Sequence, residues 1–299
     1  MSKIKVVTHN GKFHADDVFS VALVSLLETN KELEIIRTRD EKVFETADWL
    51  LDVGGKIDIL KKQFDHHQIG YSEKRISNGL IYATIGLLWR EYGEKLVGSK
   101  EAAENIDKKL IEYVDAGDNG VSCKTQKDIV HAYTVYDLLD EALNPTWREA
   151  DQDGDDNLSR FLQAVEIAKV ILKREIKRAQ DFVLDKQIIL DIYNKTEDKR
   201  VLIFDKHYAW RSIVANLPEV TFIVGYDKPN DKWRLATVEE DETLIPRKSL
   251  PASWAGKKGK ELQEITGVDD ADFCHNKLFI SGSKSLAGAL KMAKLALEN

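Results

Sequence analysis

The sequence has few cysteines, no long apolar run and no basic excess. Its two cysteines, Cys123 and Cys274, lie far apart among 299 residues and lack the spacing of a zinc site. Neither a disulfide framework nor a zinc cluster is therefore supported. No apolar stretch approaches the ~18 residues of a membrane span, and the first residues form neither a secretory nor a transit segment. We expect a cytoplasmic protein with no membrane partner.

The charge of the chain is negative and unevenly distributed. A net charge of −7 argues against a general binder of polyanions. Residues 1–182 hold 26 Lys and Arg against 33 Asp and Glu, whereas residues 183–299 hold 18 of each. Carboxylates clustered in the first part would repel phosphate groups unless cations neutralised them.

The first 120 residues alternate strand patterns with helix patterns. The predicted strands are residues 4–7, 33–37, 48–53 and 63–65, and the predicted helices are residues 16–28, 40–46, 79–93 and 101–115. This order predicts an α/β fold with a mostly parallel sheet flanked by helices. Ligand sites in such sheets lie beyond the carboxyl ends of the strands.

The length of the chain allows two domains. We expect a metal-binding catalytic domain over residues 1–155, a linker helix with one apolar stripe over 156–184, and a smaller α/β substrate-binding domain over 185–299. Within the last, residues 188–193, 201–204, 220–226, 233–238 and 278–280 are predicted strands, and 285–297 a terminal helix.

Four clusters of histidine and aspartate each follow an apolar segment, and two of them hold four of the seven histidines. The clusters are His9 with His14, Asp16 and Asp17; Asp52; Asp65-His66-His67; and Asp115 with Asp118. Any one of these residues alone could be a helix cap or a surface histidine. Together they favour a divalent metal site, because carboxylate and imidazole ligands suit ions such as Mn, Fe, Co or Zn.

A paired-metal hydrolytic site needs a group that bridges two ions, which would polarise a phosphoryl oxygen and activate water. Asp52 is the candidate bridge, and Asp65 or His67 is placed to orient the imidazole of His66. The candidate catalytic residues are Asp52, Asp65, His66 and His67. The candidate metal ligands are His9, His14, Asp16, Asp17, Asp52, His66, Asp115 and Asp118.

Asp65-His66-His67 matches the motif that names the DHH phosphoesterase superfamily, and the chain more closely resembles its MYG branch of metal-dependent hydrolases or exonucleases. The matching segments are Thr8-His9-Asn10-Gly11 with Phe13-His14; Arg37-Thr38-Arg39-Asp40; Asp52-Val53-Gly54-Gly55; Asp65-His66-His67-Gln68; Gly79-Leu80-Ile81-Tyr82; Asp115-Ala116 with Asp118-Asn119-Gly120; Leu143-Asn144-Pro145-Thr146-Trp147; Trp233-Arg234; and Leu250-Pro251.

The resemblance implies a two-domain DHH-type fold, two divalent ions (manganese, or magnesium) and cleavage of phosphodiester bonds, with characterised relatives acting as 3′–5′ RNA exonucleases. By the resemblance, the ligands are His9, His14, Asp16, Asp52, His66 and Asp115. It leaves open the roles of Asp17, Asp65, His67 and Asp118. The acids of the superfamily's first motif fall at Phe13 and Ala15 here, so His14 and Asp16 stand one residue later.

A second departure from the superfamily lies near the C-terminus. A Gly-Gly-His element that grips substrate in relatives reads Ser281-Gly282-Ser283 here. Serines and a lysine at a helix start still suit an anion, although a plain serine cap is the alternative. The candidate substrate-binding residues are Arg234, His275, Ser283 and Lys284. A basic segment from Arg247 to Lys260 around Trp254 could contact nucleic acid, but a solvated loop is slightly favoured.

The function predicted from sequence is that of a metal-dependent phosphodiesterase, a 3′–5′ exonuclease on RNA or short single-stranded oligonucleotides with two ions activating water. One alternative is a DHH-type hydrolase of a small phosphate compound, such as a dinucleotide or pyrophosphate. Others are a non-catalytic metal-dependent binding protein and a peptide or amide hydrolase. The expected partner is the nucleic acid substrate, and a homodimer is a further candidate.

Overall fold

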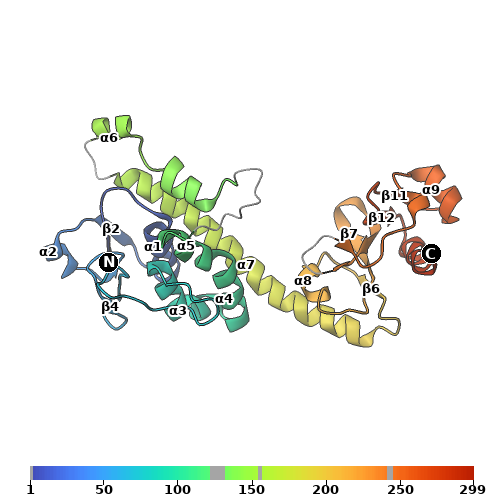
Figure 1. The fold of residues 1–299 in the computed structure, drawn as a ribbon, viewed down its shortest axis with the longest axis horizontal. Coiled ribbons are helices and arrows are strands. Elements are labelled where there is room, and N and C mark those ends of the chain that lie inside the picture. Colours follow the sequence, from blue (N-terminus) through green and yellow to red (C-terminus); the bar gives the residue numbers. More distant parts are fainter. Residues whose placement is uncertain (1–2, 122–131, 154–156, 241–244) are drawn as a thin grey trace. The chain divides into compact units, whose positions relative to one another are not determined.

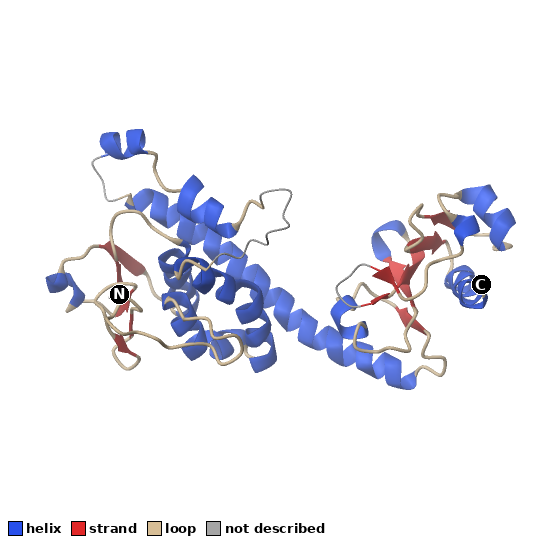
Figure 2. Cartoon of the chain, viewed as in Figure 1, coloured by secondary structure: helices blue, strands red, loops and turns tan. Residues whose placement is uncertain are grey.

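The computed structural model describes residues 3–121, 132–153, 157–240 and 245–299 (Figure 1), without the side chains of 151–153. Cys123 and the predicted start of the linker helix lie outside the described residues. The chain divides into two compact units, Met1–Gln180 and Asp181–Asn299, and each is described by itself. Both units combine strands with helices (Figure 2), so the predicted α/β class is confirmed.

The first unit is built on a five-stranded sheet in the order β2-β1-β3-β5-β4. Its strands are β1 (Ile4–Thr8), β2 (Leu33–Arg37), β3 (Trp49–Leu51), β4 (Ile57–Asp58) and β5 (Gln63–Phe64). All pairs are parallel except β4 with β5, and the short β4 is the one strand of this sheet that the sequence pattern does not predict. Because β1, β3 and β5 are parallel, their carboxyl ends meet at one edge. His9, Asp52 and Asp65 directly follow these three strands.

Helices α1 (Ala15–Leu27) and α3 (Thr84–Val97) contact this sheet, and the unit holds further helices. These are α2 (Glu41–Phe44), α4 (Lys100–Ile106), α5 (Glu112–Asp118) and α6 (Trp147–Asp153), with π-helical turns η1 (Asp107–Ile111) and η2 (Asp137–Ala142). Every residue of α1 from Ala15 to Val24 is buried. These buried residues include Asp16, Asp17 and Ser20 as well as apolar side chains. The helix lies inside the core of the unit, where it contacts β3, α3, α5 and η2. The predicted helix over 101–115 is interrupted by η1.

Helix α7 (Leu158–Lys195) belongs to both units. It continues well past residue 184, so the strand predicted over 188–193 is wrong. Those residues include Ile189, Ile192 and Tyr193, which pack with Phe182 against one core of the second unit. This spacing is helical, and no Gly or Pro interrupts the run, so the apolar segment extends the helix.

The second unit holds a five-stranded sheet in the order β11-β12-β8-β7-β6. The strands are β6 (Val201–Phe204), β7 (Phe222–Asp227), β8 (Lys232–Thr237), β11 (Ala271–Cys274) and β12 (Ile280–Ser283), and a separate pair joins β9 (Glu239–Glu240) to β10 (Ile245–Pro246). In the five-stranded sheet β6 and β7 are parallel and the other pairs antiparallel. The helices are α8 (Arg211–Val214), α9 (Gly259–Thr266) and α10 (Leu286–Glu298), with 3-10 turns η3 (Lys228–Asn230) and η4 (Ala252–Trp254).

No helix within the described part of the chain has both the length and the apolar character needed to cross a membrane.

Candidate metal centre

Histidines and aspartates gather at the carboxyl edge of the first sheet. Their potential ligand atoms form three groups, and the atoms of each group lie within 4.8 Å of one another. The groups are Asp52, Asp65, His66 and His67; His9, His14 and Asp52; and Asp16, His66 and Asp118. Across the described residues, every such group lies in the first unit. Segments far apart in the sequence are thus brought to one place.

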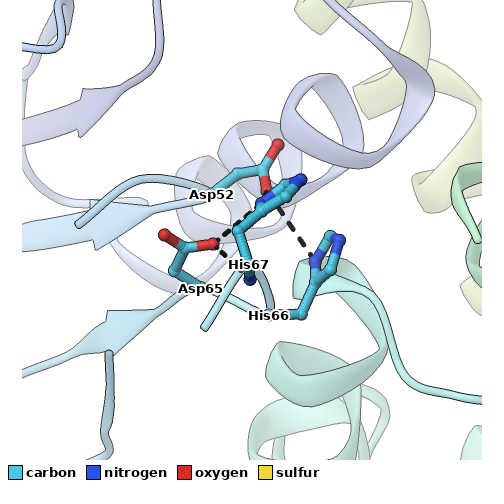
Figure 3. A group of neighbouring side chains, drawn as sticks. All are labelled: Asp52, Asp65, His66 and His67. Carbon is cyan, nitrogen blue, oxygen red and sulfur yellow. Dashed lines mark hydrogen bonds and ion pairs between the residues drawn. The ribbon is translucent and has the colours of Figure 1, made fainter. Parts of the chain in front are cut away.

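Asp52 contacts imidazoles through both of its carboxylate oxygens. Its Oδ1 lies 3.2 Å from His67 Nδ1, as drawn in Figure 3, and its Oδ2 lies 3.4 Å from His9 Nε2. The residue follows β3 with a left-handed backbone, φ 53°. Burial raises the pKa of Asp52, but hydrogen bonds with His67 and His9 outweigh burial and lower it below its usual value. Asp52 therefore occupies the shared position that a bridging ligand requires.

The imidazole of His9 faces two carboxylates. Its Nδ1 lies 3.0 Å from the carbonyl oxygen of Asn10, which can only accept, so this nitrogen carries the proton. In the neutral ring, Nε2 then presents a lone pair to Asp17 Oδ2 at 3.2 Å and to Asp52 Oδ2. Both His9 Nε2 and Asp17 Oδ2 are buried without a hydrogen-bond partner. Three acceptors that converge in this way fit a cation between them.

A proton on His9 would also satisfy these acceptors. Burial lowers the pKa of His9, but the interactions that a proton on Nε2 would make with Asp17 and Asp52 outweigh burial and raise the pKa to about 10. A divalent ion can replace that proton, because metal binding requires a neutral imidazole and releases protons.

A second convergence surrounds His66. Its Nδ1 lies 3.3 Å from Thr84 Oγ1, and this hydroxyl donates to Asp52 Oδ1 at 3.2 Å. The hydroxyl proton is thus used, so His66 Nδ1 donates and its Nε2 is left with a lone pair. That Nε2 lies 3.0 Å from Asp118 Oδ2. The lone pair of His66 Nε2 and the carboxylate oxygen of Asp118 again form a pair of ligand atoms suited to a cation.

Asp65 and His67 form a supporting pair. Asp65 accepts hydrogen bonds from the backbone N–H groups of Gly55 (2.6 Å) and His67 (2.9 Å), and its Oδ1 lies 2.9 Å from His67 Nδ1. Hydrogen bonds with Asp52 and then Asp65 raise the pKa of His67 to about 10. The His67 side chain is 61% exposed, so its other nitrogen, Nε2, lies towards solvent at the rim of the centre.

Asp16 serves the neighbouring helix as well as the centre. Its two oxygens accept the backbone N–H groups of Thr84 (3.1 Å) and Ile85 (2.7 Å) at the start of α3. Burial, followed by the charges of Asp118 and Asp52, raises the pKa of Asp16 well above its usual value. The sequence pattern suggested a cap for its own helix, whereas Asp16 caps α3 and remains within the group that includes His66.

Asp115, a predicted metal ligand, lies outside the three groups, and its fully buried carboxylate has protein partners. Oδ2 accepts from Arg75 Nη2 at 2.5 Å, and Oδ1 accepts the N–H groups of Ala83 and Gly86. Burial raises the pKa of Asp115 to about 7 in spite of Arg75. Arg75 and Thr84 form hydrogen bonds with Asp115 and Asp52, respectively. No sequence pattern distinguishes either residue from an ordinary loop residue.

The one-residue shift of the first motif has a structural basis. Phe13 and Ala15, at the positions where the superfamily motif predicts acids, are fully buried. His14 is the N-cap of α1, and its ring centroid lies 5.4 Å from that of His9. The shift thus leaves His14 and Asp16 in the ligand groups, while Phe13 anchors the segment in the core.

The predicted substrate residues of the second unit have partners within that unit. Arg234 Nε donates to Asp227 at 2.8 Å, and His275 Nδ1 accepts the N–H of Lys277 at 3.1 Å. Lys284 is exposed before α10. Ser283 is fully buried and donates to the carbonyl of Asp270 at 3.4 Å, so its hydroxyl is used within this unit and its role as a substrate contact stays a prediction.

The basic segment around Trp254 is also used internally. Arg247 donates to the carbonyl oxygens of Leu217, Val220 and Ala215, each at 2.7 Å. Trp254 is 3% exposed within a core cluster. Its indole is therefore unavailable for stacking on a base.

Fold and site together define an α/β protein with a candidate divalent-metal centre at the edge of a parallel sheet. A family model described as uncharacterised protein family UPF0160, MYG1 exonuclease, matches residues 5–297. The human MYG1 exonuclease is 30% identical over 332 residues, covering 99% of this chain and 86% of the human protein. MYG1 protein C694.04c of Schizosaccharomyces pombe is 27% identical over 320 residues, covering 99% and 98%. The chain belongs to the MYG1 exonuclease family, which confirms the resemblance.

Among solved structures, the pGpG-specific phosphodiesterase PggH of Vibrio cholerae matches with 13% identity and a TM-score of 0.31, covering 99% of this chain and 98% of that chain. A TM-score this low supports no argument about the site, so the DHH placement stays a prediction.

Proposed function

We propose that this protein is a metal-dependent phosphodiesterase that acts as a 3′–5′ exonuclease on RNA or short single-stranded oligonucleotides, with two divalent ions, manganese or magnesium. The observation that carries the proposal is the pair of convergences at which an imidazole lone pair faces carboxylate oxygens, one at His9 and one at His66. Asp52 contacts both sides. The exonuclease names of the human and rat relatives support the choice of substrate.

The side chains of the centre have different proposed roles, as metal ligands or as a proton donor. His9, His14, Asp17 and Asp52 would hold one ion, and His66, Asp16 and Asp118 the other. Bound ions supply Lewis acidity and lower the pKa of a coordinated water. Asp65 fixes Nδ1 of His67, and the exposed Nε2 of His67 is then placed to give a proton to the leaving oxygen.

The test is a product ladder. Metal-stripped protein is incubated with 5′-end-labelled RNA and DNA, with manganese, magnesium or chelator. A ladder that shortens one nucleotide at a time from the 3′ end, only with added metal, is expected. Asp52→Asn is the control, because asparagine tolerates the left-handed backbone better than alanine. Equal cleavage by Asp52→Asn, or cleavage in chelator, would refute the proposed centre.

A second candidate is a hydrolase of a short substrate, such as a dinucleotide. It is favoured by one observation: Arg247 and Trp254, expected to contact a long strand, are bound within the second unit. The two candidates separate by substrate length. An exonuclease should gain kcat/KM from dimer to decamer, whereas a dinucleotide hydrolase should gain nothing. The cytoplasmic location and the homodimer remain predictions.

A further inference from the structure

Residues 134–144, here called the brace, contribute no side chain to the ligand groups but contact the backbone that carries them. The brace contains the π-helical turn η2, an element that recurs at functional sites. It contacts α1 and reaches the end of α5, whose last residue is Asp118. It therefore touches backbone on two sides of the centre.

Asn144 makes the closest connection. It is 8% exposed, and its Oδ1 accepts the N–H of Phe13 at 3.1 Å. Its Nδ2 donates to the carbonyl of Phe13 at 2.8 Å and to that of Asp140 at 3.1 Å. One amide side chain thus pairs with both backbone groups of Phe13, as a neighbouring strand would, across 131 positions of sequence.

The paired residue lies between two candidate ligands, His9 and His14. The same loop is held at Gly11, whose carbonyl accepts from Arg37 Nη2 at 2.9 Å. The ring of Phe13 packs edge-on against Phe161, with centroids 5.7 Å apart. The loop is therefore fixed at two backbone positions and one side chain, and the directions of both imidazoles depend on these attachments.

The brace also contacts the flanking backbone. The backbone N–H of Ala15, the first residue of α1, acts to lower the pKa of Asp140, although burial outweighs it and raises that pKa to about 7. The hydroxyl of Tyr136 donates to the carbonyl of Val114 in α5, and its ring lies against Gly117, where any Cβ would collide with it. Gly117 precedes Asp118, so the brace contacts the ligand-bearing ends of both helices.

We propose that Asn144 is a positioning residue of the metal centre: by clamping Phe13 it sets the geometry of His9 and His14 and so the affinity for the divalent ion. The inference rests on the proposed metal-dependent function. Partners that orient metal ligands typically change metal affinity by about 10–100-fold when they are removed.

The test uses the sign of the change in Asn144→Asp. The new carboxylate cannot donate to the carbonyl of Phe13 and instead repels it, whereas its added negative charge would by itself attract a cation. A clamp therefore predicts weaker binding, and simple electrostatics predicts tighter binding. Manganese is titrated calorimetrically into the chelator-stripped full chain. We expect affinity to fall by about tenfold or more. Unchanged or tighter binding would overturn the proposal.

The matched control is Thr146→Ala. Thr146 is exposed next to the brace. Its Oγ1 caps the start of α6 by accepting the N–H of Glu149 at 3.4 Å. Its manganese affinity should stay within about twofold of wild type, well short of the loss expected for an orienting partner. A wild-type protein that binds no manganese would refute the proposed function itself, whereas wild-type binding matched by Asn144→Asp would refute only the clamp.

A purely structural role for Asn144 makes a different prediction. If Asn144 only stabilises the fold, Asn144→Asp would lower the fraction of active protein and therefore kcat. It would not raise the manganese concentration needed for half-maximal activity. The clamp raises that concentration and leaves kcat at saturation nearly unchanged. If Asn144→Asp does not fold, Asn144→Ser removes the clamp without adding charge, and the same two readouts decide.

Discussion

The metal centre of the first unit and the segment before α10 in the second were both predicted to be functional, yet their polar groups differ in one respect. In the first unit His9 Nε2 and Asp17 Oδ2 are buried without hydrogen-bond partners. Among the described residues of the second unit, Arg234 and Ser283 bind within that unit, and the buried atom without a partner is the neutral hydroxyl oxygen of Ser281. Groups that the fold leaves unsatisfied are available for chemistry, whereas satisfied groups chiefly stabilise the fold.

Strand direction explains much of this difference. The parallel strands β1, β3 and β5 deliver their following residues to one edge. In the second unit, β12 is antiparallel to β8, with Gly282 opposite Arg234 and Ser283 opposite Trp233. Because successive residues of a strand point to opposite faces, Arg234 and Ser283 lie on different faces of the sheet. They cannot jointly hold one phosphate group.

The largest expected effect compares Asp52→Asn with Ser283→Ala. Asp52→Asn should lower kcat/KM by about a thousandfold or more, because metal-dependent charge stabilisation is worth several kcal/mol. Ser283→Ala should change kcat/KM by less than about twofold, because the Ser283 hydroxyl is buried and interacts only with Asp270 of its own unit. Steady-state kinetics on the same oligonucleotide measure both variants.

Metal content measured on the same preparations separates the explanations. Asp52→Asn should retain less than the wild-type metal, and Ser283→Ala the full amount. If Ser283→Ala lost activity as severely as Asp52→Asn, the contrast between the two regions would be false.

The next effect compares two arginine–aspartate pairs. Arg75 is buried and pairs with Asp115, whereas Arg234 is exposed and pairs with Asp227. Arg75→Met leaves a buried carboxylate unpaired and should cost about 3–5 kcal/mol of unfolding free energy. Arg234→Met should cost under about 1 kcal/mol. Urea unfolding followed by circular dichroism measures both, and equal losses would mean that Asp115 does not depend on Arg75.

Much of this contrast could be predicted from sequence, because strand patterns and residue types are local. The three strands that carry the centre, and the clusters after them, follow from apolar runs ending in His or Asp. Asp52 could be selected as a bridge because it stands alone between two other clusters. These inferences needed only strand order and the rule that parallel strands share an edge.

The features that could not be predicted from sequence depend on partners that are distant along the chain. Asp115 resembles the other aspartates, and only the fold places Arg75 beside it, 40 positions away. The segment 188–193 has strand composition, but its apolar residues also fit a helix, and packing against the second unit decides for the helix. Asn144 likewise gives no sign in sequence of its contact with Phe13.

Metal removal should affect the two units differently. If metal is present at about 100 times its dissociation constant, binding adds about 2.7 kcal/mol of stability. For a unit of this size that corresponds to a melting shift of about 5–10 °C. Chelator should therefore lower the main melting transition, and magnesium or manganese should restore it.

Hydrogen exchange locates the effect. Peptides over residues 9–17 and 52–67 should gain protection with metal, and peptides over 271–285 should not. Equal gains of protection in both sets of peptides would mean that metal binding is not confined to the proposed centre of the first unit.

The smallest effect concerns acid stability. Glu28 is paired with Lys62 and Lys31, each at 3.0 Å, and accepts from Trp49 Nε1. Burial raises the pKa of Glu28, but these partners outweigh burial and lower it from 4.5 to about 2. A lowered pKa contributes stability above the unfolded value of 4.5 that is lost as pH falls towards 2.

Glu28→Gln should therefore cost about 1 kcal/mol at neutral pH, after allowance for solvent screening, and progressively less as the pH falls through this range. Its counterpart in the second unit is Asp198→Asn, which removes a pair with Arg200 whose side chains are 52% and 59% exposed. That variant should unfold like the wild type throughout. Urea unfolding at a series of pH values gives both curves. A penalty for Glu28→Gln that stayed constant with pH would mean that its pairs do not lower its pKa.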